Sequence, residues 1–137
     1  TDQLRADALA YGAEAGAVDR AIAALRVPPQ GIVDARVDLG DRTVTIAHLG
    51  AGHTRSDLVV LVPARHSGER AVVFAGDLVE ESADPAVDAD SDPAAWPDTL
   101  ERLLVVGGPD AVYVPGHGSV VDAAFVRRQQ DWLRRNA

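Results

Sequence analysis

The fold is decided by the stretch AVVFAGD (residues 71–77), in which an apolar run is followed directly by a glycine and a carboxylate. Continuous apolar runs of this length are typical of strands that are covered on both faces. The run LVVLV (residues 58–62) has the same character and lies a short distance upstream. Together they predict paired strands over 57–62 and 71–75, with Gly76 and Asp77 just past the end of the second strand.

Two other places repeat this arrangement. The motif GHT places His53 after a predicted strand 43–49, and GHG places His117 after a predicted strand 111–115. Ligand sites in α/β sheets gather at the carboxyl ends of strands, and glycine allows the backbone to approach closely there. Two neutral imidazoles and a carboxylate that converge at one point suit zinc or iron. Taken singly, each residue also fits an ordinary polar loop, so the repetition is what favours a shared metal site.

The other two histidines are not expected to bind metal. His48 is in phase with Val44 and Ile46 along the predicted strand, which indicates an inward-facing, hydrogen-bonded histidine. His66 lies in a polar turn between two strands, and we expect it to be exposed. Glu80 and Glu81 follow Asp77 closely, and the default interpretation places them in a solvated loop that spans 77–92.

The rest of the chain reads as helices and strands in alternation. Residues 2–26 predict a helix that ends at Pro28-Pro29 and whose apolar positions form one stripe, and a break at Gly12 or Gly16 is an alternative. Its stripe consists of Leu4, Ala8, Tyr11, Ala15, Val18, Ile22 and Leu25. Segments 32–39 and 43–49 flank a Gly-Asp turn and predict a hairpin.

Two further helices complete the pattern. One is predicted to start at Asp92-Pro93 or at Trp96-Pro97, because proline is favoured in the first helical turn. The other is predicted to follow Asp122 as its cap. The order of elements is typical of a mixed α/β fold. We expect a single domain, 1–137, with a helical lead-in over 1–30 and the sheet, site loops and helices over 31–137.

Composition and charge exclude several functions. The chain has no Cys and no Lys, which excludes thiolate metal sites, cysteine nucleophiles and Walker-type phosphate loops. Its net charge of −8 arises in residues 77–98, which contain acids and no arginine. Without a basic stripe we expect no nucleic-acid partner, and without a long apolar run we expect no membrane partner. The acidic segment fits either a solvated loop or a negative rim beside a cation site.

The three motifs together, GAGHTRSDLVV (50–60), VVFAGDLVEE (72–81) and VPGHG (114–118), resemble the C-terminal half of metallo-β-lactamase-fold hydrolases. The resemblance implies one half of an αββα sandwich with two divalent metal ions between its sheets. It implies that His53 completes the first metal site, that His117 binds the second metal, and that Asp77 bridges both and is the catalytic residue. Asp57 is expected to orient a ligand through a hydrogen bond. Zinc is the expected metal, with iron or manganese as alternatives.

The chain departs from that family in one large respect. The signature His-x-His-x-Asp-His is absent, because the four histidines stand at 48, 53, 66 and 117. The resemblance therefore implies that four metal ligands and one sheet are missing, which leaves the strands 57–62 and 71–75 without cover on one side. Three explanations stay open: a fragment of a longer enzyme, one half of a two-chain enzyme, or a non-catalytic interaction module.

The function implied is that of a metal-dependent hydrolase. A hydroxide that bridges the metals would attack an ester, thioester, lactone or related bond of a small-molecule substrate. This chain alone is expected to be inactive. Its expected partner is the missing N-terminal half or a second chain, with a homodimer as an alternative, and the expected location is cytoplasmic.

Overall fold

The structure, a computed structural model, describes residues 2–26, 31 and 33–136. These residues form two compact units, one within 1–31 and the other within 32–137. The expected helix end at Pro28-Pro29 and the start of the expected strand 32–39 lie outside the described residues. The expectation of a single domain stays a prediction. No helix among the described residues has the length and apolar character needed to cross a bilayer.

The first unit contains two helices where one was predicted. α1 (Asp2–Ala10) and α2 (Ala15–Ala24) are separated by a turn in which Gly12 has a φ of 86°, a left-handed conformation that favours glycine. Glu14 caps α2, because its carboxylate accepts hydrogen bonds from the backbone nitrogens of Gly16 and Ala17 at 2.8 and 2.6 Å. The predicted stripe is wrong at Tyr11, which is 94% exposed in the turn.

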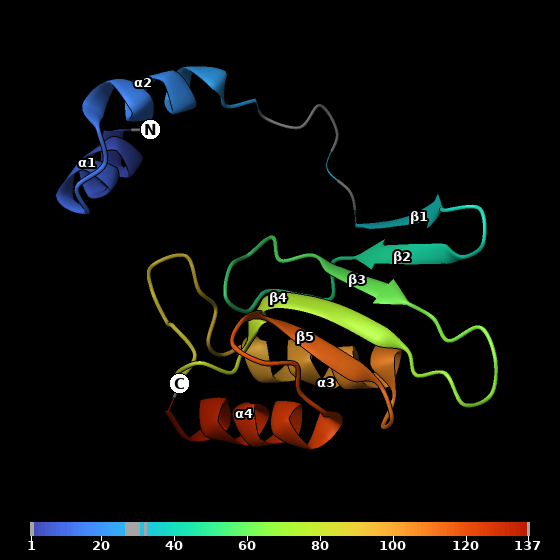
Figure 1. Cartoon of the computed structure of the whole chain (residues 1–137). Helices are drawn as coiled ribbons and strands as arrows, with labels where there is room; N and C mark the ends of the chain where they lie inside the picture. Colours follow the sequence, from blue (N-terminus) through green and yellow to red (C-terminus); the bar gives the residue numbers. More distant parts are fainter. Residues whose placement is uncertain (1, 27–30, 32, 137) are drawn as a thin grey trace. The chain divides into compact units, whose positions relative to one another are not determined.

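The second unit is built on a five-stranded sheet with the order β1-β2-β3-β4-β5 (Figure 1). Its strands are β1 (Asp34–Asp38), β2 (Thr43–Ala47), β3 (Val59–Val62), β4 (Val72–Glu80) and β5 (Val112–His117). The predicted hairpin is confirmed, since β1 pairs with β2 in an antiparallel register. β3 is antiparallel to both of its neighbours, and β4 and β5 are parallel.

Two helices lie on one face of this sheet (Figure 1). α3 (Trp96–Gly107) begins at the second of the two predicted starts, with Pro97 in its first turn. α4 (Ala123–Asn136) follows Asp122, whose Oδ1 accepts a hydrogen bond from the backbone nitrogen of Phe125 at 2.8 Å, as predicted. The core between helices and sheet is fully buried at Trp96, Leu100, Leu103, Val73, Tyr113, Val126 and Leu133.

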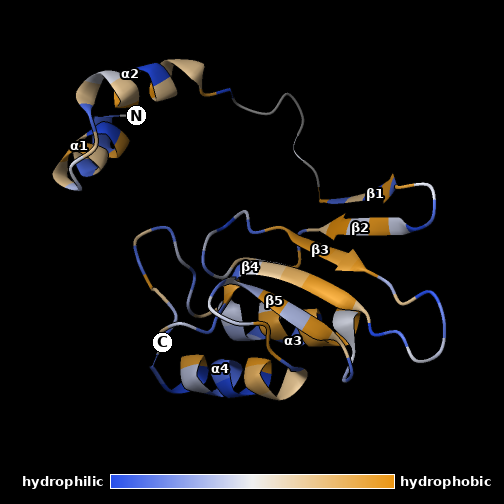
Figure 2. Ribbon diagram, viewed as in Figure 1, coloured by the Kyte–Doolittle hydropathy of each residue, from blue (hydrophilic) through white to orange (hydrophobic). Residues whose placement is uncertain are grey.

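The residues that the register places on the opposite face of the sheet are also apolar. The strands β3 and β4 are drawn mostly in the orange of hydrophobic residues (Figure 2). The register aligns Ile46, Val60, Phe74 and Val114 in one row and Val62, Val72 and Val112 in the next. Phe74 is 47% exposed, although the adjacent Val73 is completely buried against the helices. Alternate residues of a strand point to opposite faces, so this contrast identifies one covered and one open face of the sheet. We call the seven residues of the two rows the open sheet face.

Three predicted strand ends are wrong. β2 ends at Ala47 and not at residue 49. β4 continues through Gly76 and Asp77 to Glu80, so these residues lie inside a strand and not in the expected loop 77–92. β5 likewise includes His117. The physical reason is that the parallel ladder continues past an irregularity at Gly76, whose φ of 54° is left-handed.

Candidate metal centre

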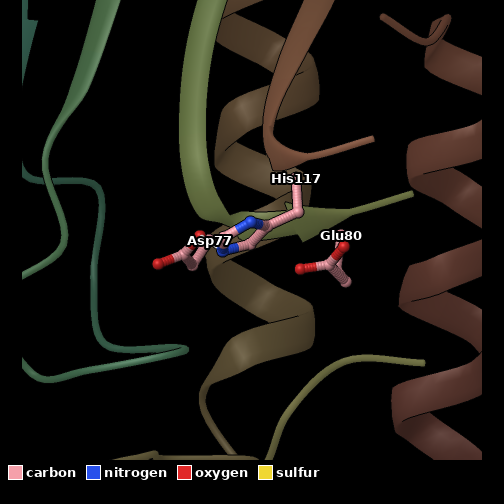
Figure 3. Close-up of side chains that lie close together, drawn as sticks. All are labelled: Asp77, Glu80 and His117. Atoms are coloured by element: carbon pink, nitrogen blue, oxygen red, sulfur yellow. Dashed lines mark ion pairs between the residues drawn. The ribbon is translucent and has the colours of Figure 1, made fainter. Parts of the chain in front are cut away.

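The irregular end of β4 brings two carboxylates to the same imidazole. Gly76 pairs with Pro115 and Glu80 pairs with His117, so four residue steps on β4 match two steps on β5. In a regular strand, residues three apart point to opposite faces. Here the bulged strand turns both Asp77 and Glu80 toward His117 at the end of β5 (Figure 3).

Asp77 stands between the two predicted histidine ligands. Its Oδ1 lies 3.3 Å from Nε2 of His117, and its Oδ2 lies 3.7 Å from Nε2 of His53. Two donor atoms bound to one ion at about 2.1 Å in a tetrahedral site are about 3.4 Å apart. The structure therefore brings the three sequence-predicted residues together, with one carboxylate oxygen facing each imidazole. This arrangement fits a carboxylate that bridges two divalent cations, and the metal-binding roles stay predictions.

Sequence reasoning missed Glu80. One donor atom each from Asp77, Glu80 and His117 lies within 4.8 Å of the other two. Asp77 and Glu80 are half-buried and His117 is exposed. The sequence interpretation placed Glu80 in a solvated loop after the strand, whereas the structure places it inside β4. The group could have been recognised from the sequence because a second acid, Glu80, follows Asp77 closely, just after the glycine at the predicted strand end.

The loop that carries His53 is held from two directions. Asp57 accepts hydrogen bonds from the backbone nitrogen and the hydroxyl of Thr54, both at 2.8 Å. Ser91, from the acidic segment, donates its hydroxyl to the carbonyl oxygen of His53 at 2.8 Å. Asp57 therefore contacts the residue next to the candidate ligand, and the expectation that it orients a ligand stays a prediction.

The imidazole of His53 packs on the core. Its ring lies edge-on to Trp96 with the centroids 5.9 Å apart, and the side chain is 23% exposed. Gly52 allows this approach, since a Cβ atom there would lie 2.5 Å from a methyl group of Leu78. The glycine of the GHT motif is thus explained by packing against the core.

The acidic segment is partly ordered around the site. The backbone nitrogen of Asp90 and the hydroxyl of Ser91 donate to the carboxylate of Asp88, at 2.9 and 3.2 Å. These hydrogen bonds, of which the backbone bond from Asp90 has the largest effect, lower the pKa of Asp88. Part of the segment is therefore an ordered negative rim beside His53.

Of the remaining histidines, His66 is exposed as predicted, whereas His48 lies just past the end of β2 and not within a strand 43–49. His48 is partly buried, and its Nδ1 lies 2.9 Å from the carbonyl oxygen of Asp57. His66 has a side chain that is 68% exposed and lies 3.9 Å from Glu69. Neither belongs to the group formed by Asp77, Glu80 and His117.

Comparisons with known proteins show what the chain as a whole is similar to. No family model matches the chain. A curated relative, metallo-beta-lactamase type 2 of Bacteroides fragilis, is 29% identical over 97 residues, which cover 69% of this chain and 37% of the relative. The chain therefore spans little more than a third of that relative's length.

Solved structures give the same likeness. A metallo-beta-lactamase from Pontibacter korlensis superposes with a TM-score of 0.69 at 26% identity, over 89% of this chain and 56% of the other. The crystal structure of VMB-1 superposes with a TM-score of 0.66 at 21% identity, over 85% of this chain and 52% of the other. This chain thus matches about half of each structure.

Proposed function

The chain has part of the metallo-β-lactamase fold, and on this premise we propose that it supplies one half of a metal-dependent hydrolase. The observation that carries the proposal is the position of Asp77, whose two carboxylate oxygens face the imidazoles of His53 and His117. These three residues come from separate segments of the chain. Such convergence at one end of a sheet is typical of a site and not of scattered surface residues.

Each residue has a role in the proposed centre. A pair of bound divalent ions lowers the pKa of water and stabilises the negative charge that develops during hydrolysis. His53 and His117 donate through Nε2, the atom that faces the carboxylate in each case. Asp77 fixes the spacing between the two positions and neutralises part of their charge. Zinc suits this set of donors, and iron and manganese are the alternatives.

The open sheet face supports the part of the proposal that concerns a further layer of structure. An exposed apolar sheet surface of this kind marks a contact with another layer of structure. The sequence contains no His-x-His-x-Asp-His motif, so the ligands that the family adds are not among its residues. We therefore propose that a second sheet, from the same polypeptide or from a second chain, covers this face and brings those ligands. The substrate class that follows is a small molecule with an ester, thioester, lactone or related bond.

The test is the metal content and activity of the protein that contains both halves. We expect stoichiometric divalent metal by mass spectrometry and hydrolysis of generic esters or lactones. Asp77→Ala and His117→Ala should lose bound metal and activity together. His66→Ala is the matched control, because His66 is exposed beside Glu69. Unchanged metal content in the first two variants would reject the ligand assignment.

The open sheet face also favours one alternative, a non-catalytic interaction module. In that case the same apolar surface docks on a partner and the metal ligands are vestigial. The two functions differ in a simple measurement, since the module predicts a chain that binds its partner equally well with or without a chelator. If a chelator abolishes partner binding, the result favours the proposal that the chain is one half of a hydrolase.

A further inference from the structure

We propose that Glu80 is a metal ligand, and that Asp77, Glu80 and His117 form a cation site that this chain completes with its own side chains. This inference concerns metal binding by the chain itself. It goes beyond the proposed hydrolase, in which the carboxylate of Glu80 has no role and a second half supplies the further ligands.

The geometry of the three donors carries the proposal. One ligand atom from each side chain lies within 4.8 Å of the other two. The pair Asp77 Oδ1 and His117 Nε2, at 3.3 Å, already has the separation of two donors on one ion. Glu80 and His117 are paired across β4 and β5, so the third donor belongs to rigid sheet and not to a loop. Figure 3 shows the three side chains grouped at the ends of these strands.

The carboxylate of Glu80 is held in position by its surroundings. Its Oε1 accepts hydrogen bonds from the backbone nitrogen of Ser82, at 3.0 Å, and from the Ser82 hydroxyl. Its backbone nitrogen donates to Oε1 of Gln129 at 2.9 Å. Supports of this kind orient metal ligands, and here they leave the second carboxylate oxygen of Glu80 to bind an ion.

The charge at this point favours a cation. Asp77 and Glu80 present two carboxylates to one histidine, and among the described residues no arginine lies within 4.0 Å of either carboxylate. Two like charges that share a small site repel each other, and a divalent ion relieves this repulsion. Two carboxylates and one imidazole are a donor set that suits zinc as well as manganese.

The neighbouring acid has a different role. Glu81 accepts a hydrogen bond from the backbone nitrogen of Ser119 at 2.8 Å through Oε2, and its own nitrogen donates to the carbonyl oxygen of His117. These contacts tie the segment after β5 to the end of β4. The group is thus a specific set of three donors, and the adjacent carboxylate is structural.

The experiment uses the 137-residue chain and two probes. Zinc binding is measured by competition with a chromophoric chelator, and manganese binding by loss of the free-ion signal in electron paramagnetic resonance. We expect one ion per chain. Glu80→Gln should weaken binding by about tenfold or more, and Glu80→Asp should weaken it as well, because the shorter side chain withdraws the oxygen while it keeps the charge. Asp131→Asn removes a charge from an exposed residue of α4 outside the group and should bind like the wild type.

Three outcomes would overturn the inference. Wild-type affinity in Glu80→Gln shows that the carboxylate is not a ligand. If Glu80→Asp binds with wild-type affinity while Glu80→Gln binds weakly, the negative charge of residue 80 acts at a distance and its carboxylate is not a ligand. No binding by a chain that is folded by circular dichroism shows that the site needs the second half, and the hydrolase proposal survives that result if the two halves together bind metal.

Discussion

Gly116 leaves the space that the carboxylate of Asp77 occupies. A Cβ atom at position 116 would lie 1.8 Å from Oδ1 of Asp77 and 3.0 Å from its backbone nitrogen. No real Cβ contact is that short, so any side chain at 116 must displace the carboxylate. The glycine before His117 is thus required by the close approach of Asp77, which belongs to β4.

Gly116→Ala should therefore damage the candidate metal centre. We expect the alanine methyl group to push Asp77 away from His117, to lower zinc affinity by about tenfold or more, and to lower the free energy of unfolding by about 1–3 kcal/mol through overpacking. Zinc titration and urea denaturation measure the two effects. Gly31→Ala is the matched control, because no atom of the part of the chain that the structure describes lies within 4 Å of a Cβ atom there. Equal behaviour of the two variants would contradict the steric argument.

Gln129 links α4 to the part of β4 that carries the site. Its Nε2 donates to the carbonyl oxygen of Leu78 at 2.8 Å, its Oε1 accepts from the backbone nitrogen of Glu80 at 2.9 Å, and the side chain is buried. Gln129→Leu keeps the approximate volume and removes both hydrogen bonds. Leaving a buried backbone group unpaired costs about 1–3 kcal/mol, so we expect a loss of stability in that range.

The control for this change is the same substitution at an exposed glutamine. Gln3 lies on α1 and bonds to Asp7 at the surface. Gln3→Leu should change the free energy of unfolding by no more than about 0.5 kcal/mol. Urea denaturation of both variants checks the difference, and an equally small effect at Gln129 would show that the link is dispensable.

The open sheet face predicts a contrast between two adjacent residues. Phe74→Ser should leave the stability of the isolated chain within about 1 kcal/mol of the wild type, because the side chain is 47% exposed. Val73→Ser should cost about 3 kcal/mol or more, because the hydroxyl is placed in a fully buried core position. Phe74→Ser should also reduce binding of an apolar-surface dye. A large destabilisation at Phe74 would mean that this face is already covered in the isolated chain.

Alkaline pH should destabilise the fold through Tyr113. Burial raises the pKa of Tyr113, whose hydroxyl donates to the carbonyl oxygen of Gly108 at 2.9 Å. A group whose pKa is raised in the folded state stabilises the fold fully below its unfolded pKa, which is about 10 for tyrosine. That contribution is lost as the pH rises above 10 through the folded pKa.

The chain suits this measurement because it has no Lys and no Cys that would titrate in the same range. Urea midpoints at pH 8, 10 and 11 should fall with pH in the wild type and fall less steeply in Tyr113→Phe. Tyr11→Phe, at a residue that is 94% exposed, is the matched control and should keep the wild-type slope. Identical slopes in all three proteins would contradict the role of Tyr113.

Local sequence signals predicted most elements but not all of their ends. The hairpin β1-β2, the start of α3 at Trp96-Pro97 and the Asp122 cap of α4 follow from turn residues, proline and capping, which act within a few residues. The single helix predicted over 2–26 is wrong and its alternative, a break at Gly12, is confirmed, because a left-handed Gly12 and the Glu14 cap interrupt a regular stripe. The spacing of the apolar residues alone does not show where a helix is interrupted.

The residues of the candidate site also differ in whether the sequence alone could predict them. His53, Asp77 and His117 could be named because each follows an apolar run and sits beside a glycine, which is information contained in the sequence. Glu80 could not, because its orientation depends on how many residues of β4 match β5. Strand register is a relation between segments that are distant along the chain, and the pattern of one segment does not encode it.

The element types, the glycine-flanked residues and the charge balance follow from the amino-acid order alone, because they depend on residues that are neighbours along the chain. Folding in three dimensions brings two carboxylates three residues apart to one imidazole, and it exposes Phe74 while it buries Val73. Both outcomes depend on pairing and packing between distant segments. The bulge at Gly76 and the placement of both helices on one face of the sheet are the physical reasons.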